Sequence, residues 1–444
     1  MSLTLNGSDL ALVQQSVDRA IAVRQECSRL PVFVRQRALR FAAASVRARD
    51  EEFAIAIATH GIKTIREARS EVGRCIQTLE LASGECGLQG GEAFQFDQSP
   101  QGVGRTGWWS RRSLGLVVAI TPYNDPLNLV AHKVAPAIVT GSPIIIKPHP
   151  RTPQLARMLA EAFRGGGLPD DMIQIVEGTS GQAIALAEDK RVAVVSFTGG
   201  RVGGQAVAIA AAGKRLIMEL GGVCSSMVAS DADPERAAEA LVKGITAAAG
   251  QNCVHTQVIE AAAEVYQKLV DRLCSGLASL TMGPKLEESS DVGPLVDEAH
   301  ACRVEQLIQS AIQGGGRVLC GGTREGAFIR PTLIADVPTT HSLVRDEVFG
   351  PVAIIRKYDT PSEAIDRIRS AGPTINASVF TQRLDLILRF RDEIDAGTIV
   401  VNDSTDFRID AMPFGGNGQS GLGREGIRYA AEAMTEPQLV CLRP

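Results

Sequence analysis

Residues 114–147 read LGLVVAITPYNDPLNLVAHKVAPAIVTGSPIIIK, and this stretch decides the fold class. The apolar, β-branched run at 116–121 predicts a strand, residues 128–139 predict a helix, and residues 143–147 predict a second strand. Pro136 lies inside the helical stretch and is expected to kink or shorten it. Both strands are continuously apolar rather than alternating, which is typical of a parallel sheet covered on both faces. The stretch therefore predicts a β-α-β unit of an α/β protein.

The same alternation continues toward the C-terminus. A helix is expected at 155–163, ended by the three glycines at 165–167, and strands are expected at 173–176 and 192–197. This pattern predicts a doubly wound sheet whose ligands bind at the C-terminal ends of the strands. From about residue 223 the alternation resumes and predicts a second α/β domain. Its clearest expected elements are strands at 352–355, 377–380 and 398–401 and a helix at 384–394.

The region before residue 114 has a different character. Residues 8–60 and 63–83 carry apolar side chains at helical spacing and predict helices. Residues 88–113 are rich in Gly, Gln and Ser and predict a loop leading into an amphipathic strand that leaves the main body.

Composition excludes several classes of protein. The 444 residues carry a formal net charge of −4 with no basic stripe, which argues against a nucleic-acid partner. The apolar runs are shorter than the roughly 20 residues of a membrane span. Nine cysteines lack metal-ligand spacing and no secretion signal is evident, so we expect reduced thiols, a cytoplasmic protein and no metal.

Two glycine-containing stretches carry residues capable of chemistry. Residues 198–204 read TGGRVGG after a predicted strand, and such a turn lets backbone N–H groups approach a phosphate at a helix N-terminus. A tight turn that needs glycine explains them equally well. Residues 250–253 read GQNC after an Ala-rich helix predicted at 247–249. Cys253 is either a nucleophile, which needs an electropositive setting, or a buried structural cysteine.

Two polar residues follow predicted strands. Glu219 comes before Gly221 and Gly222, where a carboxylate would face the expected cleft, and the alternative is a helix-capping or ion-paired glutamate. Asn124 follows the strand at 116–121, where its amide could stabilise an oxyanion or merely form a turn between two prolines.

Together these stretches resemble the aldehyde dehydrogenase superfamily over about residues 10–440. Seven motifs occur in the order and approximate spacing of that family. They are TPYN at 121–124, IKP at 146–148, FTG at 197–199, ELGG at 219–222, GQNC at 250–253, EVFGP at 347–351 and PFGG at 413–416. The stretches WSRRSLG at 109–115 and NDPLNLVAHK at 124–133 look most like the lactaldehyde and phosphonoaldehyde branches.

The resemblance implies a fold of two doubly wound α/β domains with a small β oligomerisation arm. The cofactor-binding domain would comprise residues 1–96 and 115–222, and the catalytic domain residues 223–420. The arm would comprise residues 97–114 and 433–444 and would pair between subunits of a homodimer or homotetramer.

The resemblance also implies roles for individual residues. Cys253 would attack the aldehyde, Asn124 would hold the oxyanion, and Glu219 would activate the water that hydrolyses the thioester. NAD(P)+ would be bound by nine residues, with Lys147 and Glu347 at the ribose groups and Phe349 at the nicotinamide end. The nine are Thr121, Pro122, Lys147, Thr198, Gly199, Gly200, Leu220, Glu347 and Phe349.

Two departures from the family pattern concern the cofactor. Gly200 stands where many members carry a serine that touches a phosphate, and Arg201 is a candidate replacement. Pro150 stands where NAD-preferring members often carry a glutamate that would repel a 2′-phosphate. The sequence therefore favours NADP+ slightly over NAD+.

The substrate is predicted as a small polar aliphatic aldehyde that carries an acid group in some cases, such as a phosphonoaldehyde or a semialdehyde. Arg74 resembles an arginine that binds the acid group in related branches, although an ion-paired helix residue explains it equally well. Asp125 would repel an anion if it faced the pocket. The substrate contacts expected from the resemblance are Arg74, Asn252, His255 and Phe414.

Two alternatives stay open. An acylating enzyme would pass the thioester to coenzyme A, but that branch generally lacks the equivalent of Glu219. A catalytically idle relative that acts as a binding protein would be expected to lack Cys253, Glu219 or Asn124, and all three are present.

Overall fold

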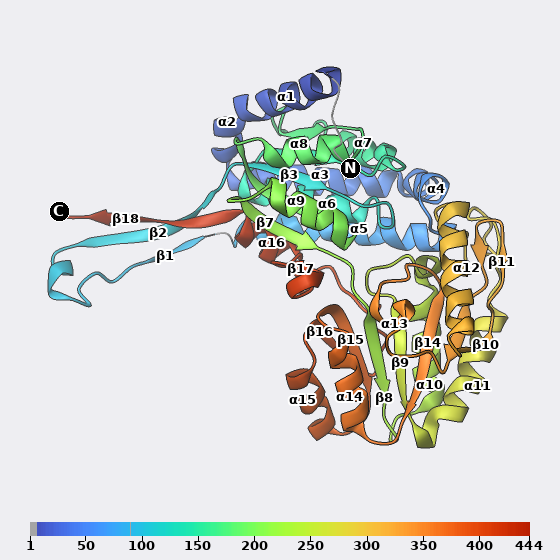
Figure 1. Ribbon diagram of the computed structural model, residues 1–444. Helices are drawn as coiled ribbons and strands as arrows, with labels where there is room; N and C mark the ends of the chain where they lie inside the picture. The colour runs from blue at the N-terminus through green and yellow to red at the C-terminus, as the bar shows by residue number, and fades with distance from the viewer. Residues whose placement is uncertain (1–6, 89) are drawn as a thin grey trace.

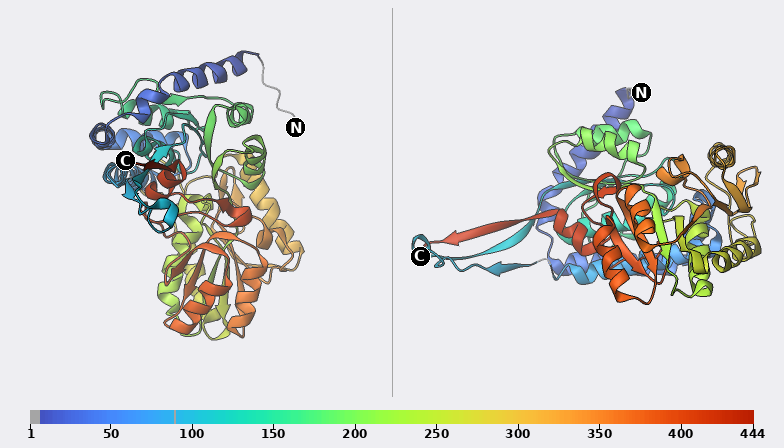
Figure 2. Two further views of the ribbon diagram at one scale, coloured as in Figure 1. Left: turned by 90° about the vertical axis from the view of Figure 1, so that its left-hand side faces the viewer. Right: turned by 60° about the horizontal axis from the view of Figure 1, so that its bottom comes forward.

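The computed structural model describes residues 7–88 and 90–444, which form two lobes and a projecting arm (Figure 1). Each lobe is built on one largely parallel sheet, and the arm is a separate three-stranded sheet. Two further views show that the arm extends well away from both lobes (Figure 2).

The first sheet has the strand order β17-β7-β6-β3-β4-β5. Its neighbours are parallel except for β17, which pairs antiparallel with β7. The strands are β3 (Leu116–Ile120), β4 (Ile144–Lys147), β5 (Ile173–Ile175), β6 (Val192–Thr198), β7 (Arg215–Glu219) and β17 (Gly421–Leu422). The four strands predicted between residues 116 and 197 are confirmed, each within one residue of its expected bounds.

Helices cover both faces of this sheet because successive strand residues point to opposite sides. Val117 and Ala119 of β3 pack in one core cluster with α3 to α7, whereas Leu116 and Val118 pack in another with α1, α8 and α9. The helices are α1 (Gly7–Ala22), α2 (Arg24–Ser28), α3 (Val32–Ala48), α4 (Asp50–His60), α5 (Ile65–Glu85), α6 (Asn128–Thr140), α7 (Pro153–Ala162), α8 (Ser180–Glu188) and α9 (Arg201–Ala210). The doubly wound arrangement predicted from the continuous apolar strands is confirmed.

Helix α6 continues past Pro136 to Thr140, so the prediction that this proline shortens the helix is wrong. Every residue of α6 is buried, and this packing outweighs the loss of one backbone hydrogen bond. Gly141 ends the helix with φ 68°, and a Cβ there would lie 2.7 Å from the Cys27 carbonyl oxygen. Both conformation and space therefore require glycine at this position.

The second sheet has the order β10-β13-β14-β9-β8-β15-β16, parallel except between β10 and β13. Its strands are β8 (Cys224–Val228), β9 (Thr256–Ala262), β10 (Arg317–Cys320), β13 (Thr332–Ala335), β14 (Val352–Tyr358), β15 (Thr374–Phe380) and β16 (Ala396–Val401). Its long helices are α10 (Pro234–Thr246), α11 (Ala263–Ser279), α12 (Glu298–Gln313), α14 (Pro361–Ser370) and α15 (Leu384–Glu393). The elements predicted between residues 352 and 401 all lie within these bounds, apart from the last residue expected for the helix.

The arm consists of β1 (Gly91–Ala93), β2 (Thr106–Ser113) and β18 (Thr435–Leu442), in the order β1-β2-β18 and antiparallel throughout. Trp108 of β2 and Leu439 of β18 are about half exposed. The amphipathic strand expected before residue 114 is β2. Helix α16 (Ile427–Ala433) precedes β18 and packs against α6, which fixes the base of the arm to the first lobe.

Candidate active site

A cavity of about 750 Å³ is lined by residues that follow the C-terminal ends of β3, β4, β6 and β7 and by residues of the second lobe. This is the edge at which parallel α/β sheets bind ligands. All of the residues predicted from the sequence line it, with one exception. They are Asn124, Glu219 and Cys253; Thr121, Pro122, Lys147, Thr198, Gly199, Gly200, Leu220, Glu347 and Phe349; and Arg74, Asn252 and Phe414.

His255 is the exception, and its predicted substrate contact is not supported. It is buried but does not line the cavity. A turn closed by a 3.1 Å hydrogen bond from the His255 N–H to the Asn252 carbonyl carries the chain away from the cavity and into β9. Burial lowers the pKa of His255 to about 3, so the ring is neutral inside the protein.

The turn between β6 and α9 forms one part of the cavity wall. Gly200 is the N-cap of α9 with an extended backbone (φ −67°, ψ 154°), and no side chain caps the helix. The free N–H groups of the first turn and the helix dipole therefore suit a phosphate. Arg201, the candidate replacement for the missing serine, donates from its Nε to the Gly221 carbonyl at 2.9 Å and does not line the cavity.

Lys147 and Glu347 supply the buried charged groups in this part of the cavity. Lys147 ends β4, its Nζ donates to the Pro148 carbonyl at 3.1 Å, and burial lowers its pKa to about 8. Burial raises the pKa of Glu347 to about 7, against the influence of Arg201. Glu347 lies directly over Gly221, where a Cβ would come within 2.0 Å of its carboxylate. An ammonium and a carboxyl group are thus placed where sugar hydroxyls could be bound.

The residues after Lys147 bear on the choice between NAD+ and NADP+. His149 and Pro150 line the cavity, whereas Arg151 forms an ion pair with Asp297 outside the lining. Burial lowers the pKa of His149 to about 4, so its ring is uncharged at neutral pH. Among the described residues that directly follow Lys147 in the chain, those that line the cavity therefore include no carboxylate and no second permanent cation.

Cys253 lies on a loop whose backbone is tightly constrained. The Ala-rich helix predicted at 247–249 is wrong, because Ala248 and Ala249 both have φ 52° inside a short 3-10 turn, Ala247–Gly250. Left-handed alanine costs roughly 1–2 kcal/mol, so the surrounding contacts must hold this turn. Gly250 has φ 69°, and a Cβ there would lie 2.2 Å from the Gly350 carbonyl oxygen.

Gln251 fixes this loop to the second lobe. Its Nε2 donates to the Ala248 carbonyl at 3.3 Å, and its Oε1 accepts from the Val296 N–H at 2.9 Å. Burial raises the pKa of the Cys253 thiol well above its ordinary value, and Arg408 opposes this effect. The thiol is therefore protonated at neutral pH and must lose its proton when it reacts.

Glu219 ends β7 with both carboxylate oxygens buried and without hydrogen-bond partners. Burial raises its pKa well above the ordinary value, and the neighbouring Glu425 raises it further. A Cβ at Gly415 would lie 2.4 Å from Glu219 Oε1, so glycine leaves the space that this carboxyl group occupies. A buried carboxyl with a raised pKa and no partner is suited to accept a proton from a ligand in the cavity.

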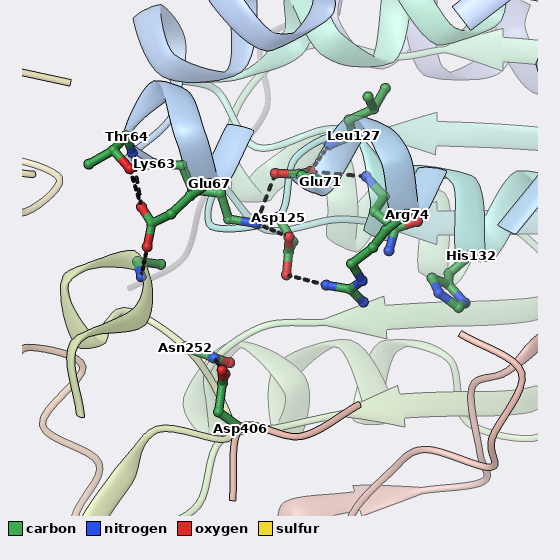
Figure 3. Close-up of polar contacts among 12 residues, drawn as sticks. Lys63, Thr64, Glu67, Glu71, Arg74, Asp125, Leu127, His132, Asn252 and Asp406 are labelled. Carbon is green, nitrogen blue, oxygen red and sulfur yellow. Dashed lines mark hydrogen bonds and ion pairs between the residues drawn. The ribbon is translucent and has the colours of Figure 1, made fainter. Parts of the chain in front are cut away.

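Asn124 precedes Asp125, which belongs to an ion-pair network with Lys63, Glu71 and Arg74 (Figure 3). Glu71 Oε1 accepts from the backbone N–H groups of Leu127 at 2.8 Å and Asn128 at 3.0 Å. Lys63 bridges Glu71, at 3.0 Å, and Asp125. In the described part of the chain the side-chain amide of Asn124 makes no hydrogen bond of its own, so it remains available to a ligand.

Arg74 both lines the cavity and forms ion pairs. Its Nη2 lies 2.9 Å from Asp410 Oδ1. Its Nη1 lies 3.9 Å from Asp125 Oδ2, the contact drawn in Figure 3. Asp125 is therefore paired with both Lys63 and Arg74, and its charge is compensated rather than free to repel an anion.

The side chain of Asn252 makes two hydrogen bonds within the protein. It donates to Asp406 and accepts from the Val254 N–H at 3.1 Å. It therefore braces the loop on either side of Cys253, and this use competes with the substrate contact predicted for it.

Arg408 is a lining residue that the sequence did not reveal. Its guanidinium lies 3.7 Å from the ring centroid of Phe414, its Nε is buried without a partner, and its Nη2 lies 3.5 Å from Glu425 Oε2. Glu425 also pairs with Lys133 at 2.8 Å. No motif marks an isolated arginine in a loop, and the single available signal is its position five residues before Pro413.

Within residues 7–88 and 90–444, no helix is long and apolar enough to cross a membrane. The same residues contain no group of three or more His, Cys, Asp or Glu side chains arranged to hold a metal ion.

The cavity thus combines a thiol, a buried carboxyl and a free amide with a helix N-terminus suited to a phosphate, as a dinucleotide-dependent oxidoreductase with a cysteine nucleophile requires. The sequence matches the aldehyde dehydrogenase family over residues 3–440, and the chain belongs to this family. It is an NAD(P)+-dependent aldehyde dehydrogenase, and the family resemblance drawn from the seven motifs is confirmed.

Three comparisons describe its relatives. The chain is 38% identical over 418 residues to aspartate-semialdehyde dehydrogenase 1 of Pseudomonas canavaninivorans, covering 94% of this chain and 88% of the relative. It is 34% identical over 432 residues to 3-sulfolactaldehyde dehydrogenase of Priestia aryabhattai, covering 97% and 91%. Its structure is similar to glyceraldehyde-3-phosphate dehydrogenase of Methanocaldococcus jannaschii complexed with NADP, with a TM-score of 0.94, 33% identity and coverage of 98% and 95%.

Proposed function

We propose that the protein oxidises a short aliphatic aldehyde carrying an acid group to the carboxylic acid with NAD(P)+. The observation that carries this proposal is that Arg74 and Arg408 line the same cavity as Cys253, Glu219 and Asn124. The three relatives compared above are named for aldehydes that carry a carboxylate, a sulfonate or a phosphate, which supports a substrate of this kind.

Cys253 is the proposed nucleophile. Its sulfur adds to the aldehyde carbon as the thiol proton passes to water in the cavity, and the carbonyl oxygen becomes an oxyanion. Asn124 is placed to donate its free amide to that oxygen, because the network of Lys63, Glu71 and Asp125 holds its loop. Loss of one such donor typically costs about 10²–10³ in rate.

The residues at the other part of the cavity fit a dinucleotide. The N-terminus of α9 would bind a phosphate, Lys147 and Glu347 would bind ribose hydroxyls, and Phe349 would support the nicotinamide. NAD(P)+ held by these residues would supply the hydride acceptor for the carbon attached to Cys253, so that the adduct would become a thioester.

Glu219 is the proposed base for hydrolysis of the thioester. Neither of its oxygens has a hydrogen-bond partner in the protein, so a water molecule in the cavity is the expected partner. Its raised pKa makes it a stronger base than an exposed glutamate once it is ionised. The oxygen of the activated water then attacks the thioester carbonyl, and the Cys253 sulfur leaves with the acid released.

Two arginines are the proposed contacts for the acid group of the substrate. Arg408 pairs with Glu425 at 3.5 Å but keeps its Nε without a partner, whereas Arg74 pairs with both Asp410 and Asp125. Arg408 therefore has the greater capacity. Arginine suits carboxylate, sulfonate and phosphonate groups alike, since its planar fork donates two parallel hydrogen bonds. Phe414, stacked beneath Arg408, would line the aliphatic part of the substrate.

We further propose that NADP+ is slightly preferred to NAD+. In support, Pro150 leaves no carboxylate to repel a 2′-phosphate and Lys147 supplies a cation, although His149 is uncharged.

From the family resemblance we also propose the division of the chain into domains. The cofactor-binding domain comprises residues 1–96 and 115–222, the catalytic domain comprises residues 223–420, and the arm joins subunits of a homodimer or homotetramer. A cytoplasmic location is part of the same proposal.

The proposal is tested by following reduction of NAD+ and NADP+ with aldehydes matched in length. The set pairs carboxylate, sulfonate and phosphonate aldehydes with neutral analogues, and coenzyme A is added in a parallel series. We expect higher kcat/KM for acid-bearing aldehydes, the free acid as product with and without coenzyme A, and no turnover by Cys253→Ala. Preference for neutral aldehydes would refute the assigned substrate class.

A further inference from the structure

A second cavity, of about 630 Å³, lies where the arm joins the first lobe and shares no lining residue with the catalytic cavity. Its walls come from α2, the first turn of α3, the end of α6 and the roots of β2 and β18. Four arginines and four hydroxyl groups line it. They are Arg24, Arg35, Arg111 and Arg112, with Ser28, Ser113, Thr140 and Thr435.

The charges in this cavity are unbalanced. Of the described residues that line it, none is Asp or Glu. Within the two described ranges, the one ion pair made by these arginines joins Arg112 to Glu436 at 3.5 Å on the open surface. Four like charges in one cavity repel each other, in a chain whose net charge is −4. No carboxylate among the described lining residues therefore balances these charges.

Two of the guanidinium groups are held in place by the protein. Arg111 Nε donates to Thr435 Oγ1 and its Nη2 donates to the Glu432 carbonyl, both at 2.7 Å. Arg35 Nη1 donates to the Val139 carbonyl at the end of α6. These contacts leave other N–H groups of the same guanidinium groups available to a ligand.

One buried donor lacks a partner. Arg35 Nε is buried and makes no hydrogen bond, which native proteins avoid because an unmade bond at a buried group costs free energy. Burial also lowers the pKa of Arg35, so its charge is disfavoured as the cavity stands. An anion in the cavity would supply both an acceptor and a counter-charge.

We propose that this cavity is a binding site for a multiply charged oxyanion, with phosphate or polycarboxylate chemistry. Arginine forks with hydroxyl donors match oxygen atoms arranged around phosphorus or along a polycarboxylate. The volume suits a small molecule rather than a macromolecule. The site does not depend on the function proposed for the catalytic cavity, because the two cavities have separate walls.

The test is calorimetric titration of the whole protein with pyrophosphate and with citrate, in a buffer free of phosphate. Saturating NAD+ is present so that the catalytic cavity offers no phosphate site. The variant is Arg24→Gln combined with Arg112→Gln, two exposed side chains whose loss leaves the contacts of Arg35 and Arg111 intact. The control is Arg29→Gln, an exposed arginine of the same segment outside the cavity.

We expect one anion to bind per chain. Its affinity should fall about tenfold for each guanidinium group removed and should be unchanged in the control. No binding of either anion to the wild-type protein, or equal weakening in the double variant and the control, would overturn the proposal. Sedimentation of the same samples tests a different occupant. If the double variant changes only the oligomeric state and binds anions as the wild type does, the cavity receives a carboxylate of another subunit and the proposal fails.

Discussion

Replacing Glu219 with glutamine separates the two halves of the proposed reaction. Both oxygens of Glu219 are buried without partners, so an amide of the same shape breaks no hydrogen bond. A carboxyl whose pKa is raised by folding disfavours the folded state as the pH rises, because the folded protein holds its proton more tightly than the unfolded chain. The variant is therefore expected to be at least as stable as the wild type at neutral pH.

The kinetic effect is expected to be large and confined to hydrolysis. Loss of a positioned general base typically costs about 10²–10⁴ in rate, which corresponds to roughly 3–5 kcal/mol of barrier at 1.36 kcal/mol for each factor of ten. Addition of Cys253 and hydride transfer do not need Glu219 in this scheme. Glu219→Gln should therefore form one equivalent of reduced cofactor per active site rapidly and then turn over slowly.

Stopped-flow absorbance of the reduced cofactor measures both phases in one experiment. Across a pH series, the slow rate of the wild type is expected to rise with pH through a pKa above the ordinary glutamate range, because the base must be ionised. The variant should lose this rise. Steady-state turnover at the wild-type rate, or absence of the burst with a folded variant, would refute the assignment of Glu219.

Three further predictions follow from the same cavity. Asn124→Ala is expected to lower kcat about 10²–10³-fold with little change in cofactor affinity, measured by steady-state kinetics and cofactor titration; an unchanged kcat would exclude its amide from the reaction. Arg408→Met is expected to raise KM about tenfold or more for acid-bearing aldehydes and to leave neutral ones nearly unchanged, with Arg74→Ala having a smaller effect; equal effects on both substrate types would make these residues structural. Lys133→Met removes the cation paired with Glu425 at 2.8 Å and is expected to lower the free energy of unfolding by roughly 3–5 kcal/mol, measured by denaturant titration. Burial would raise the pKa of Glu425, but Lys133 and Arg408 outweigh it and lower this pKa to about 2. The wild type should therefore lose this stabilisation as the pH falls from about 4.3 toward 2. A free energy of unfolding that stays constant over this window would contradict the pairing.

Much of the fold was predictable because the two sheets are buried on both faces. Continuous apolar strands such as 116–120 and 192–198 leave few alternatives to a parallel sheet. The prediction for Pro136 failed because local preference was outweighed by packing that buries the whole of α6. The prediction of an α-helix in the Ala-rich stretch before Cys253 was wrong for a related reason. Helix propensity favours an α-helix there, but the packing of Gly250 against Gly350 and the hydrogen bonds of Gln251 hold a left-handed turn.

Some residues of the site could be predicted from the sequence, and others depend on packing that the sequence does not reveal. The residues carried by ordered motifs meet in one cavity, because each motif follows the end of a strand or a fixed turn. The substrate contact predicted for His255 is not supported, because one turn is enough to carry a neighbour of Cys253 away from the cavity. Arg408 could not be found from the sequence, since its role depends on Phe414 and Glu425, which the fold brings beside it.

The most direct test of the central claim is to locate the covalent intermediate. Glu219→Gln is mixed with an acid-bearing aldehyde and NADP+, quenched, digested and examined by mass spectrometry, with the same mixture lacking NADP+ as control. We expect an acyl group on Cys253 that requires the oxidised cofactor. An acyl group on another cysteine, such as the neighbouring Cys224, or no acyl group although reduced cofactor has formed, would contradict the proposed mechanism.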